Sequence, residues 1–328
     1  MTRYLPQWWC PPADSGAVNA CAEELIGRGL DVRRGQPLGS WTTLGVGGAA
    51  AVYVEPRDLA EVGVLMEVIG RTAESAVPLL VMGRGSNLLV SDSGWPGVAL
   101  RLGAGLKHYV RDGLRVEAGG GTSMPALAAW CAKESLAGLE FAAGIPATVG
   151  GSVRMNAGAH GGETADLLVE VDVAVPGDRT PATLKRDEMG FGYRRSRLPA
   201  RSVVVAARWD LAPGDPAAIR RELDELRAWR RDTQPLRQRS CGSVFTNPSG
   251  DSAGRLVDAA GLKGRRRGGA QISEKHANFI VVEPTCLAAD VLRLIADARR
   301  AVHEVGGPLL EPEVRVVGDF AEVADDDA

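Results

Sequence analysis

Gly144-Ile-Pro-Ala-Thr-Val-Gly-Gly-Ser-Val-Arg-Met-Asn-Ala-Gly-Ala-His-Gly-Gly162 is the most informative segment of the chain. Six of its nineteen residues are glycine, so much of its backbone can adopt positive φ or lie directly against a flat ligand. This composition predicts neither a helix nor a strand. A flexible linker is the alternative, but apolar residues recur at Ile145, Val149, Val153 and Met155. The pattern therefore favours a loop in close contact with a ligand.

A second glycine-rich turn, Gly83-Arg-Gly-Ser-Asn-Leu-Leu-Val-Ser-Asp92, directly follows an expected strand at Pro78–Met82. A strand that runs into such a turn is typical of phosphate binding by backbone N–H groups. The turn is not a Rossmann fingerprint, because Leu88 stands where that motif needs glycine, and the chain has no Walker A motif. Taken alone it also fits a structural hairpin, but the Gly144–Gly162 segment favours a phosphate loop.

The Gly-Ile-Pro-x-Thr-Val-Gly-Gly and Asn-Ala-Gly-Ala motifs resemble the flavin-contacting loop of the UDP-N-acetylenolpyruvoylglucosamine reductase family. Further motifs of that family follow in the same order, over about residues 38–318. The resemblance implies an α+β protein, with a two-lobed FAD-binding fold of the vanillyl-alcohol-oxidase (PCMH) type followed by a smaller α/β substrate-binding domain. The expected parts are an irregular N-terminal arm (1–21), the FAD-binding domain (22–210), the substrate-binding domain (211–318) and an acidic tail (319–328).

The resemblance also implies that FAD is bound without a covalent link and that NADPH is the hydride donor. The positions that match the family's flavin-contacting motifs are Thr43, Gly83, Arg84, Gly85, Ser86, Asn87, Leu88, Gly120, Thr122, Gly144, Ile145, Pro146, Thr148, Val149, Gly150, Gly151, Asn156 and Gly158.

Three residues match the family's catalytic positions. Arg194, in a Tyr-Arg-Arg-Ser motif, corresponds to an arginine beside the substrate carboxylate. Ser243, in Gly-Ser-Val-Phe-Thr-Asn-Pro, corresponds to the serine that donates a proton, and Glu313, in Leu-Glu-Pro-Glu-Val-Arg, to the catalytic glutamate. The matching substrate-contacting positions are Tyr193, Asn247, Lys263 and His276.

The implied reaction belongs to peptidoglycan precursor synthesis. NADPH reduces FAD, and a hydride then adds to the enol ether of UDP-N-acetylglucosamine enolpyruvate, which becomes UDP-N-acetylmuramate. An unactivated enol ether resists hydride, so the adjacent carboxylate must act as an electron sink. Arg194 with Glu313 would stabilise the charge that develops on the enolate. Ser243 would protonate the neighbouring carbon.

Two other functions are weighed against this one. A flavoprotein oxidase of the same fold is the first, but many such enzymes attach flavin through a histidine near the phosphate loop, and Gly83–Asp92 contains none. A non-catalytic module that binds cell-wall nucleotides is the second. The combination of Arg194, Ser243 and Glu313 disfavours it, because a binding module needs no proton donor.

The chain departs from the family pattern at four positions. Ala147 replaces a glycine, and Arg154 and His160 replace an apolar residue and a tyrosine. Thr246 stands where lysine or arginine is common, so the phosphate or cofactor contact expected there is not assigned. The short spacing between the arginine and serine motifs indicates the subtype without the tyrosine-bearing lid.

Composition indicates a soluble globular protein. The 328 residues carry a net charge of −3 and are 45% hydrophobic, with a mean hydropathy of −0.06. This balance argues against nucleic acid as a partner. No apolar run is long enough to cross a bilayer and no signal-peptide core begins the chain, so we expect a cytoplasmic protein without a membrane partner. The resemblance implies that the partners are a UDP-sugar and NADPH, and we expect a monomer. Five scattered cysteines and four histidines without ligand-like spacing predict reduced thiols and no metal.

Hydrophobic periodicity and capping residues predict helices and strands along the whole chain. Helices are expected at 17–28, 56–74, 123–135, 216–231 and 288–305, with Ser123 as a cap. Strands are expected at 50–54, 78–82, 98–102, 114–118, 169–175 and 203–209.

Overall fold

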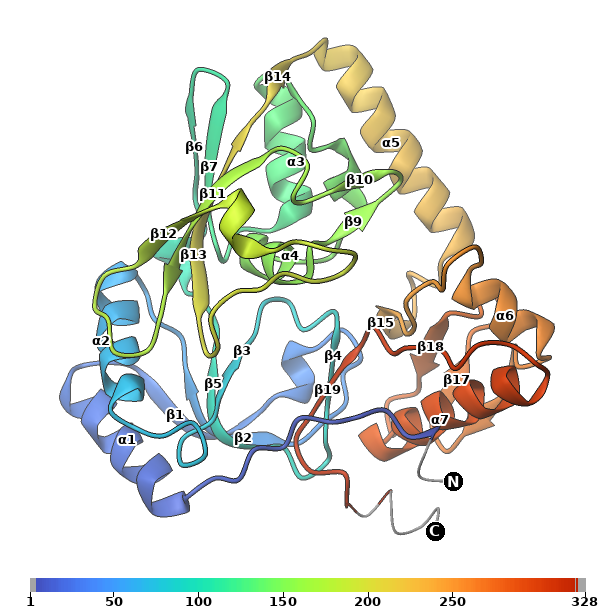
Figure 1. Cartoon of the computed structure of the whole chain (residues 1–328), viewed down its shortest axis with the longest axis horizontal. Coiled ribbons are helices and arrows are strands. Elements are labelled where there is room, and N and C mark those ends of the chain that lie inside the picture. Colours follow the sequence, from blue (N-terminus) through green and yellow to red (C-terminus); the bar gives the residue numbers. More distant parts are fainter. Residues whose placement is uncertain (1–3, 322, 324–328) are drawn as a thin grey trace.

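The computed structural model describes residues 4–321 and 323 of the chain. Figure 1 shows three groups of elements: an N-terminal lobe with α1 and α2, a second lobe with α3 and α4, and a C-terminal group with α6 and α7. Each group has its own sheet and its own buried apolar cluster. The described residues contain no helix with the length and apolar character that a bilayer span requires.

The first lobe is a four-stranded sheet covered by two helices. Its strand order is β1 (Val32–Pro37), β2 (Ala49–Val54), β5 (Trp95–Leu100) and β3 (Leu79–Val81), and its helices are α1 (Ser15–Gly27) and α2 (Leu59–Gly70). Helix α2 forms because Asp58 caps its first turn by accepting a hydrogen bond from the Glu61 amide at 3.0 Å. Its apolar residues at Val62, Leu65 and Met66 recur at helical spacing and are fully buried.

The second lobe is a five-stranded antiparallel sheet. Its order is β12 (Ala182–Lys185), β11 (Leu168–Ala174), β13 (Val203–Asp210), β7 (Arg115–Gly119) and β6 (Tyr109–Asp112). The helices of this lobe are α3 (Met124–Lys133) and α4 (Val149–Met155), and its short strands are β8 (Leu136–Ala137), β9 (Gly158–Ala159), β10 (Gly162–Glu163) and β14 (Ala212–Pro213). Helix α3 has Ser123 at its N-cap position, but the serine side chain makes no capping hydrogen bond, so that detail of the prediction is wrong.

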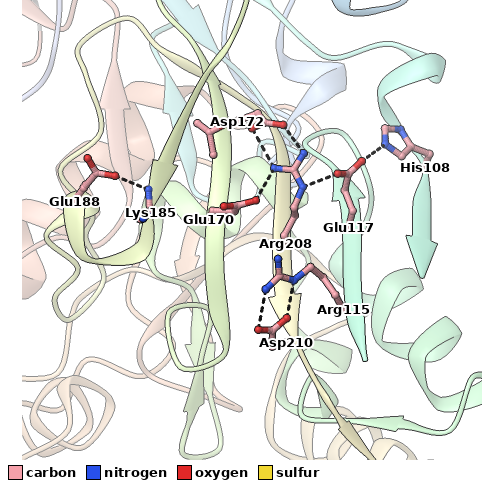
Figure 2. Close-up of polar contacts among 10 residues, drawn as sticks. His108, Arg115, Glu117, Glu170, Asp172, Lys185, Glu188, Arg208 and Asp210 are labelled. Atoms are coloured by element: carbon pink, nitrogen blue, oxygen red, sulfur yellow. Dashed lines mark hydrogen bonds and ion pairs between the residues drawn. The ribbon is translucent and has the colours of Figure 1, made fainter. Parts of the chain in front are cut away.

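One face of this second sheet is apolar and packed, whereas the other carries an ion-pair network (Figure 2). Arg208 on β13 pairs with Glu117 on β7 at 2.7 Å and with Glu170 and Asp172 on β11 at 3.3 and 2.7 Å. Alternating side chains of a strand point to opposite faces, so Ala207 next to Arg208 is buried in the core. The network therefore marks the outer face of the sheet.

The C-terminal group is a four-stranded antiparallel sheet with two helices. Its strand order is β15 (Arg239–Ser243), β18 (Phe279–Val282), β17 (Ala270–Ile272) and β16 (Arg266–Arg267), and its helices are α6 (Ala253–Ala259) and α7 (Ala288–Glu304). The long helix α5 (Pro216–Thr233) leads from the second lobe into this group (Figure 1).

The end of the chain returns to the first lobe. Strand β19 (Arg315–Val317) pairs in parallel with β4 (Leu88–Val90), which directly follows the Gly83–Leu88 turn. The predicted substrate-binding segment 211–318 therefore ends in a strand that belongs to the other half of the molecule. This crossing brings motifs from the two ends of the sequence together.

Most of the predicted helices and strands are present, with ends that differ by a few residues. Besides the Ser123 cap, two predictions are wrong. The Gly144–Gly162 segment contains helix α4, because Thr148 caps it by accepting a hydrogen bond from the Gly151 amide at 3.2 Å and Val149 and Val153 are buried. Its helix ends at Asn156, whose φ of 42° is left-handed.

The N-terminal arm is also less irregular than predicted. Helix α1 begins at Ser15, inside the predicted arm, because the Asp14 carboxylate accepts hydrogen bonds from two amides of its first turn. At the other end, Phe320 of the predicted acidic tail is buried and packs against Trp8. Residues 1–3, 322 and 324–328 lie outside the described residues.

Asp92 links the two halves through a helix cap. Its two carboxylate oxygens accept hydrogen bonds from the Ala288 and Ala289 amides at 2.8 and 3.0 Å, at the start of α7. We expect Asp92→Ala to lower the free energy of unfolding by about 1 kcal/mol, the usual effect of losing a helix cap. Urea titration followed by circular dichroism measures it. Asp92→Asn, which keeps one acceptor oxygen, should lie between the wild type and Asp92→Ala. Identical midpoints for the wild type and Asp92→Ala would contradict the capping role.

Candidate functional site

A cavity of about 1660 Å³ lies where the two lobes and the C-terminal group meet. Both glycine-rich segments line it, and so do residues of β15, the segment before β19 and the N-terminal arm. Sites for a single small ligand usually measure about 300–1,000 Å³. The cavity is therefore large enough for a dinucleotide cofactor together with a substrate.

The two glycine-rich segments face each other across one wall, and their glycines are required by this close approach. A Cβ on Gly83 would lie 2.5 Å from the Thr148 hydroxyl oxygen. Gly85 has a φ of +62°, and a Cβ there would lie 2.4 Å from the Trp41 carbonyl oxygen. A larger residue at Gly83 would push the two segments apart, and one at Gly85 would push the turn away from Trp41.

Most of the predicted cofactor residues line this cavity. They are Gly83, Arg84, Gly85, Ser86, Asn87, Leu88, Gly120, Gly144, Ile145, Pro146, Thr148, Gly150, Gly151 and Gly158. The other four predicted residues, Thr43, Thr122, Val149 and Asn156, do not contribute to its lining.

These four residues support the wall instead. The Asn156 side chain donates a hydrogen bond to the Gly192 carbonyl at 3.1 Å and accepts one from the Ala165 amide at 3.1 Å. The Thr122 hydroxyl donates to the His108 carbonyl at 2.8 Å, and Val149 is fully buried in the core. The Thr43 hydroxyl donates to the Ser240 carbonyl at 2.6 Å and so joins the first lobe to β15.

The lining fits a flavin dinucleotide. Arg101 borders the cavity with its guanidinium 4.0 Å from the Trp41 ring centroid. Its Nη1 is buried and has no hydrogen-bond partner in the described structure, and such an orphaned donor is expected to meet a ligand oxygen. Backbone N–H groups of the Gly83–Leu88 turn are suited to a diphosphate. No group of His, Cys, Asp and Glu among the described residues is placed to hold a metal ion.

The three predicted catalytic residues all line the cavity. Arg194 lies with its Nε 3.4 Å from a carboxylate oxygen of Glu313, and its Nη2 donates to the Gly158 carbonyl at 2.7 Å. Its φ of 55° is left-handed, which is uncommon for a residue with a side chain. The arginine is thus held between the Gly144–Gly162 segment and the C-terminal glutamate.

The backbone amide and carbonyl of Glu313 both make hydrogen bonds. Its amide donates to the Val244 carbonyl at 2.8 Å, and its carbonyl accepts from the Asn87 side chain at 3.0 Å. Burial raises the pKa of the Glu313 carboxyl, and the charge of Arg194 lowers it by less. The glutamate is therefore a stronger base than an exposed carboxylate and is positioned by both halves of the molecule.

Ser243 ends strand β15 directly after Gly242, whose φ is +74°. Its strand pairs with β18, and the next residue, Val244, holds Glu313 through the backbone bond described above. Ser243 and Glu313 therefore belong to one connected backbone unit.

The predicted substrate residues are divided by the structure. Asn247 lines the cavity, and its side-chain oxygen accepts a hydrogen bond from the Ala253 amide at 3.0 Å. Tyr193 lies outside the lining, beneath the Arg194 guanidinium at 4.9 Å. Lys263 and His276 also lie outside the lining. Lys263 pairs with Asp258 at 2.7 Å, and the His276 ring packs against Phe279. Burial lowers the pKa of His276, and the charge of Lys263 adds to this effect.

Several lining residues were not found from the sequence. Leu5–Trp9 of the N-terminal arm border the cavity, and nothing in their sequence indicates a site. Trp229 on α5 contacts the His160 ring at 4.6 Å, and both residues line the cavity. An exposed tryptophan on a highly charged helix is the one signal that could have found this pair.

Comparisons with known proteins agree with this geometry. Residues 50–180 match a family model described as an FAD binding domain, and residues 234–317 match the C-terminal domain of UDP-N-acetylenolpyruvoylglucosamine reductase. A reductase of this name from Symbiobacterium thermophilum is 45% identical over 288 residues, which cover 88% of this chain and 92% of the relative. The one from Heliobacterium modesticaldum is 44% identical, over 87% of this chain and 90% of the relative.

A solved structure gives the same result. The crystal structure of UDP-N-acetylenolpyruvylglucosamine reductase from Thermus caldophilus matches with a TM-score of 0.75 and 41% identity, covering 88% of this chain and 100% of that one. The chain belongs to the UDP-N-acetylenolpyruvoylglucosamine reductase family. The family and fold predicted from the sequence are confirmed, with an FAD-binding domain followed by the reductase C-terminal domain. The predicted class, a flavin-dependent oxidoreductase with FAD and NADPH, is confirmed with the family.

The raised pKa of Glu313 leads to a test in this reductase. The folded protein keeps the carboxyl neutral to a higher pH than the unfolded chain does. Glu313 therefore favours folding below its unfolded pKa, and this contribution is lost as pH rises through the folded value. As pH rises, Glu313→Gln should thus become more stable than the wild type. In acid, the free energies of unfolding of the two proteins should converge. Thermal unfolding across pH measures this difference.

Glu311→Gln is the matched control, because it removes an exposed carboxylate two positions earlier. The same pH trend in both variants would contradict a special role of burial at Glu313.

Proposed function

We propose that the chain catalyses the NADPH-dependent, FAD-mediated reduction of UDP-N-acetylglucosamine enolpyruvate to UDP-N-acetylmuramate. The observation that supports this most is the Arg194–Glu313 pair at 3.4 Å in a cavity lined by both glycine-rich segments. A cation, a buried acid and a hydroxyl meet there beside a flavin-sized space. Two relatives that are 45% and 44% identical to this chain over 288 and 286 residues carry the name of this reductase.

The two glycine-rich segments would hold FAD, which would supply the chemistry of hydride transfer from NADPH to the substrate. The residues of the chain then have three tasks. They orient the enolpyruvyl group, stabilise the charge that develops on its carboxylate side, and deliver one proton.

Arg194 is proposed to bind the substrate carboxylate. A guanidinium keeps its charge at every physiological pH and presents paired donors that match a carboxylate. Its anchoring to the Gly158 carbonyl fixes the direction of the side chain before substrate binds. Because the charge grows on the substrate during the reaction, a fixed cation there lowers the barrier more than it strengthens ground-state binding.

Ser243 is proposed to donate the proton, and Glu313 to assist at the same centre. A serine hydroxyl is a weak acid, so it can protonate only a strongly basic carbon such as that of an enolate-like intermediate. Glu313 lies in the same backbone unit, and because its pKa is raised by burial it holds a proton to a higher pH than an exposed glutamate does. The proton delivered to carbon balances the hydride that adds to its neighbour.

The substrate contacts are proposed for Asn247, Tyr193, Lys263 and His276. Asn247 is the one that lines the cavity directly. Lys263 would have to exchange its ion pair with Asp258 for a diphosphate oxygen, which is a small movement for an exposed lysine. We also propose that the enzyme acts as a monomer in the cytoplasm, where the nucleotide precursors of peptidoglycan are made.

The first test is the cofactor itself. The purified protein should be yellow, because the cavity lining offers donors for FAD. Acid precipitation should release FAD into the supernatant, because Gly83–Asp92 contains no histidine that could attach the flavin covalently. A colourless protein that cannot be reconstituted with FAD would contradict the cofactor assignment. Flavin that stays in the pellet would favour a covalent flavoprotein oxidase instead.

The second test separates the two half-reactions. Ser243→Ala should leave flavin bleaching by NADPH at the wild-type rate. Reoxidation by the enolpyruvyl substrate should slow by about 10²–10⁴-fold, the usual effect of losing a positioned general acid. Stopped-flow absorbance of each half-reaction measures both rates.

Ser240→Ala on the same strand is the matched control, because its backbone bond to Thr43 does not depend on the side chain. Equal slowing of both half-reactions in Ser243→Ala, or normal reoxidation, would reject the proton-donor role.

A further inference from the structure

Residues 4–9, here called the N-terminal strap, cross from the first lobe to the C-terminal group. In Figure 1 the dark blue chain leaves α1, passes β19 and reaches α7. The strap lies outside the residues that the two family models match, which are 50–180 and 234–317. The strap also lines the cavity from Leu5 to Trp9.

The strap pairs with β19 through its backbone. The Trp9 amide donates to the Val316 carbonyl at 3.0 Å, and the Gly318 amide donates to the Trp9 carbonyl at 3.1 Å. Trp9 thus forms a parallel bridge with Val317, on the side of β19 opposite to β4. The Trp9 ring packs against Trp95 at 4.8 Å, which anchors the strap to the first lobe.

A buried arginine joins the strap to the segment before Glu313. Arg299 on α7 has 6% of its surface exposed. Its Nη1 donates to the Tyr4 carbonyl at 2.6 Å, and its Nε donates to the Leu310 carbonyl at 2.8 Å. Burial lowers the pKa of this guanidinium. One side chain therefore holds the first described residue of the strap and a residue three positions before Glu313.

Glu313 lies between these two attachments. Leu310 precedes it in the chain, and its carbonyl accepts from Arg299, which also donates to Tyr4 of the strap. Val316 follows it, and its carbonyl accepts from the Trp9 amide of the strap. We propose that the N-terminal strap is a positioning element for Glu313, acting through β19 and Arg299. The proposal rests on the catalytic role given to Glu313 above.

The physical reason is the cost of unpaired backbone groups. Val316 and Gly318 are buried, so loss of the strap would leave a carbonyl and an amide without partners, at about 1–3 kcal/mol each. β19 would relax toward other partners, and its movement would reach Glu313 two residues away. A misplacement of ~1 Å at a catalytic group can slow a reaction by about 100-fold.

The test uses a matched pair in the full-length holoenzyme. Trp9→Pro removes the amide that bonds Val316 along with the ring, whereas Trp9→Ala removes the ring alone. We expect Trp9→Pro to slow flavin reoxidation by the enolpyruvyl substrate by about 10–100-fold relative to Trp9→Ala, the range expected for a misplaced catalytic group. Flavin reduction by NADPH should be equal in the two variants.

A variant that lacks residues 1–10 gives a second measurement. Its reoxidation should be slow, and a synthetic peptide of residues 1–12 should restore it, whereas a scrambled peptide should not. Equal reoxidation in Trp9→Pro and Trp9→Ala, or parallel loss of both half-reactions and of bound FAD, would overturn the proposal. If the wild-type enzyme does not reoxidise with this substrate, the proposed function fails rather than the strap.

Discussion

The pairing of β19 with β4 is the contact on which the candidate site depends. It places Arg315, Val316 and Val317 opposite Leu88, Leu89 and Val90, so the last strand of the chain lies against the strand that leaves the phosphate loop. The Arg315 amide donates to the Asn87 carbonyl at 3.0 Å, which extends the pairing up to the loop itself. Glu313 lies two residues before β19, so the register of this pairing fixes where Glu313 stands along the cavity. A shift by one residue would turn the side chains of β19 to the opposite face and displace Glu313 with them.

Other contacts between the two halves gather around the same place. Asn87 holds the Glu313 carbonyl, Thr43 holds the Ser240 carbonyl, and Asp92 caps α7. All three side chains come from the first lobe, and all three bind backbone groups of the C-terminal part. Backbone groups cannot rotate away as side chains can, so these bonds define the relative position of the halves closely. The groups proposed to be catalytic are thus placed by the scaffold before any ligand enters.

The electrostatics of the site follow from this placement. A carboxyl group buried at the junction of two domains has a raised pKa, because its charged form loses water. Arg194 offsets part of this loss across 3.4 Å, while its own side chain remains tied to the Gly158 carbonyl. The pair therefore keeps one cation and one readily protonated acid side by side. Such a pair is suited to a substrate that gains negative charge and then a proton.

The sequence by itself determined the family, the order of the domains and most of the residues that line the cavity. Gly83 and Gly85 can be predicted from the sequence because only glycine allows such close approach. Arg194, Ser243 and Glu313, the three proposed catalytic residues, can be predicted because their motifs are short and continuous. The sequence also predicts most helices and strands, since their apolar periodicity is local. It failed for α4, where capping by Thr148 and burial of Val149 outweigh the low helix propensity of glycine.

Only the tertiary structure decided which predicted residues line the cavity and which support its wall. Asn156 and Thr122 belong to the same motifs as their neighbours, yet their side chains bond backbone groups behind the surface. The role of the N-terminal strap was equally hidden. Trp9 lies near the start of the chain and β19 near its end, and the same is true of Tyr4 and Arg299. Local patterns report how a segment folds, whereas the direction of a side chain and the partners of a strand edge depend on segments far away in sequence.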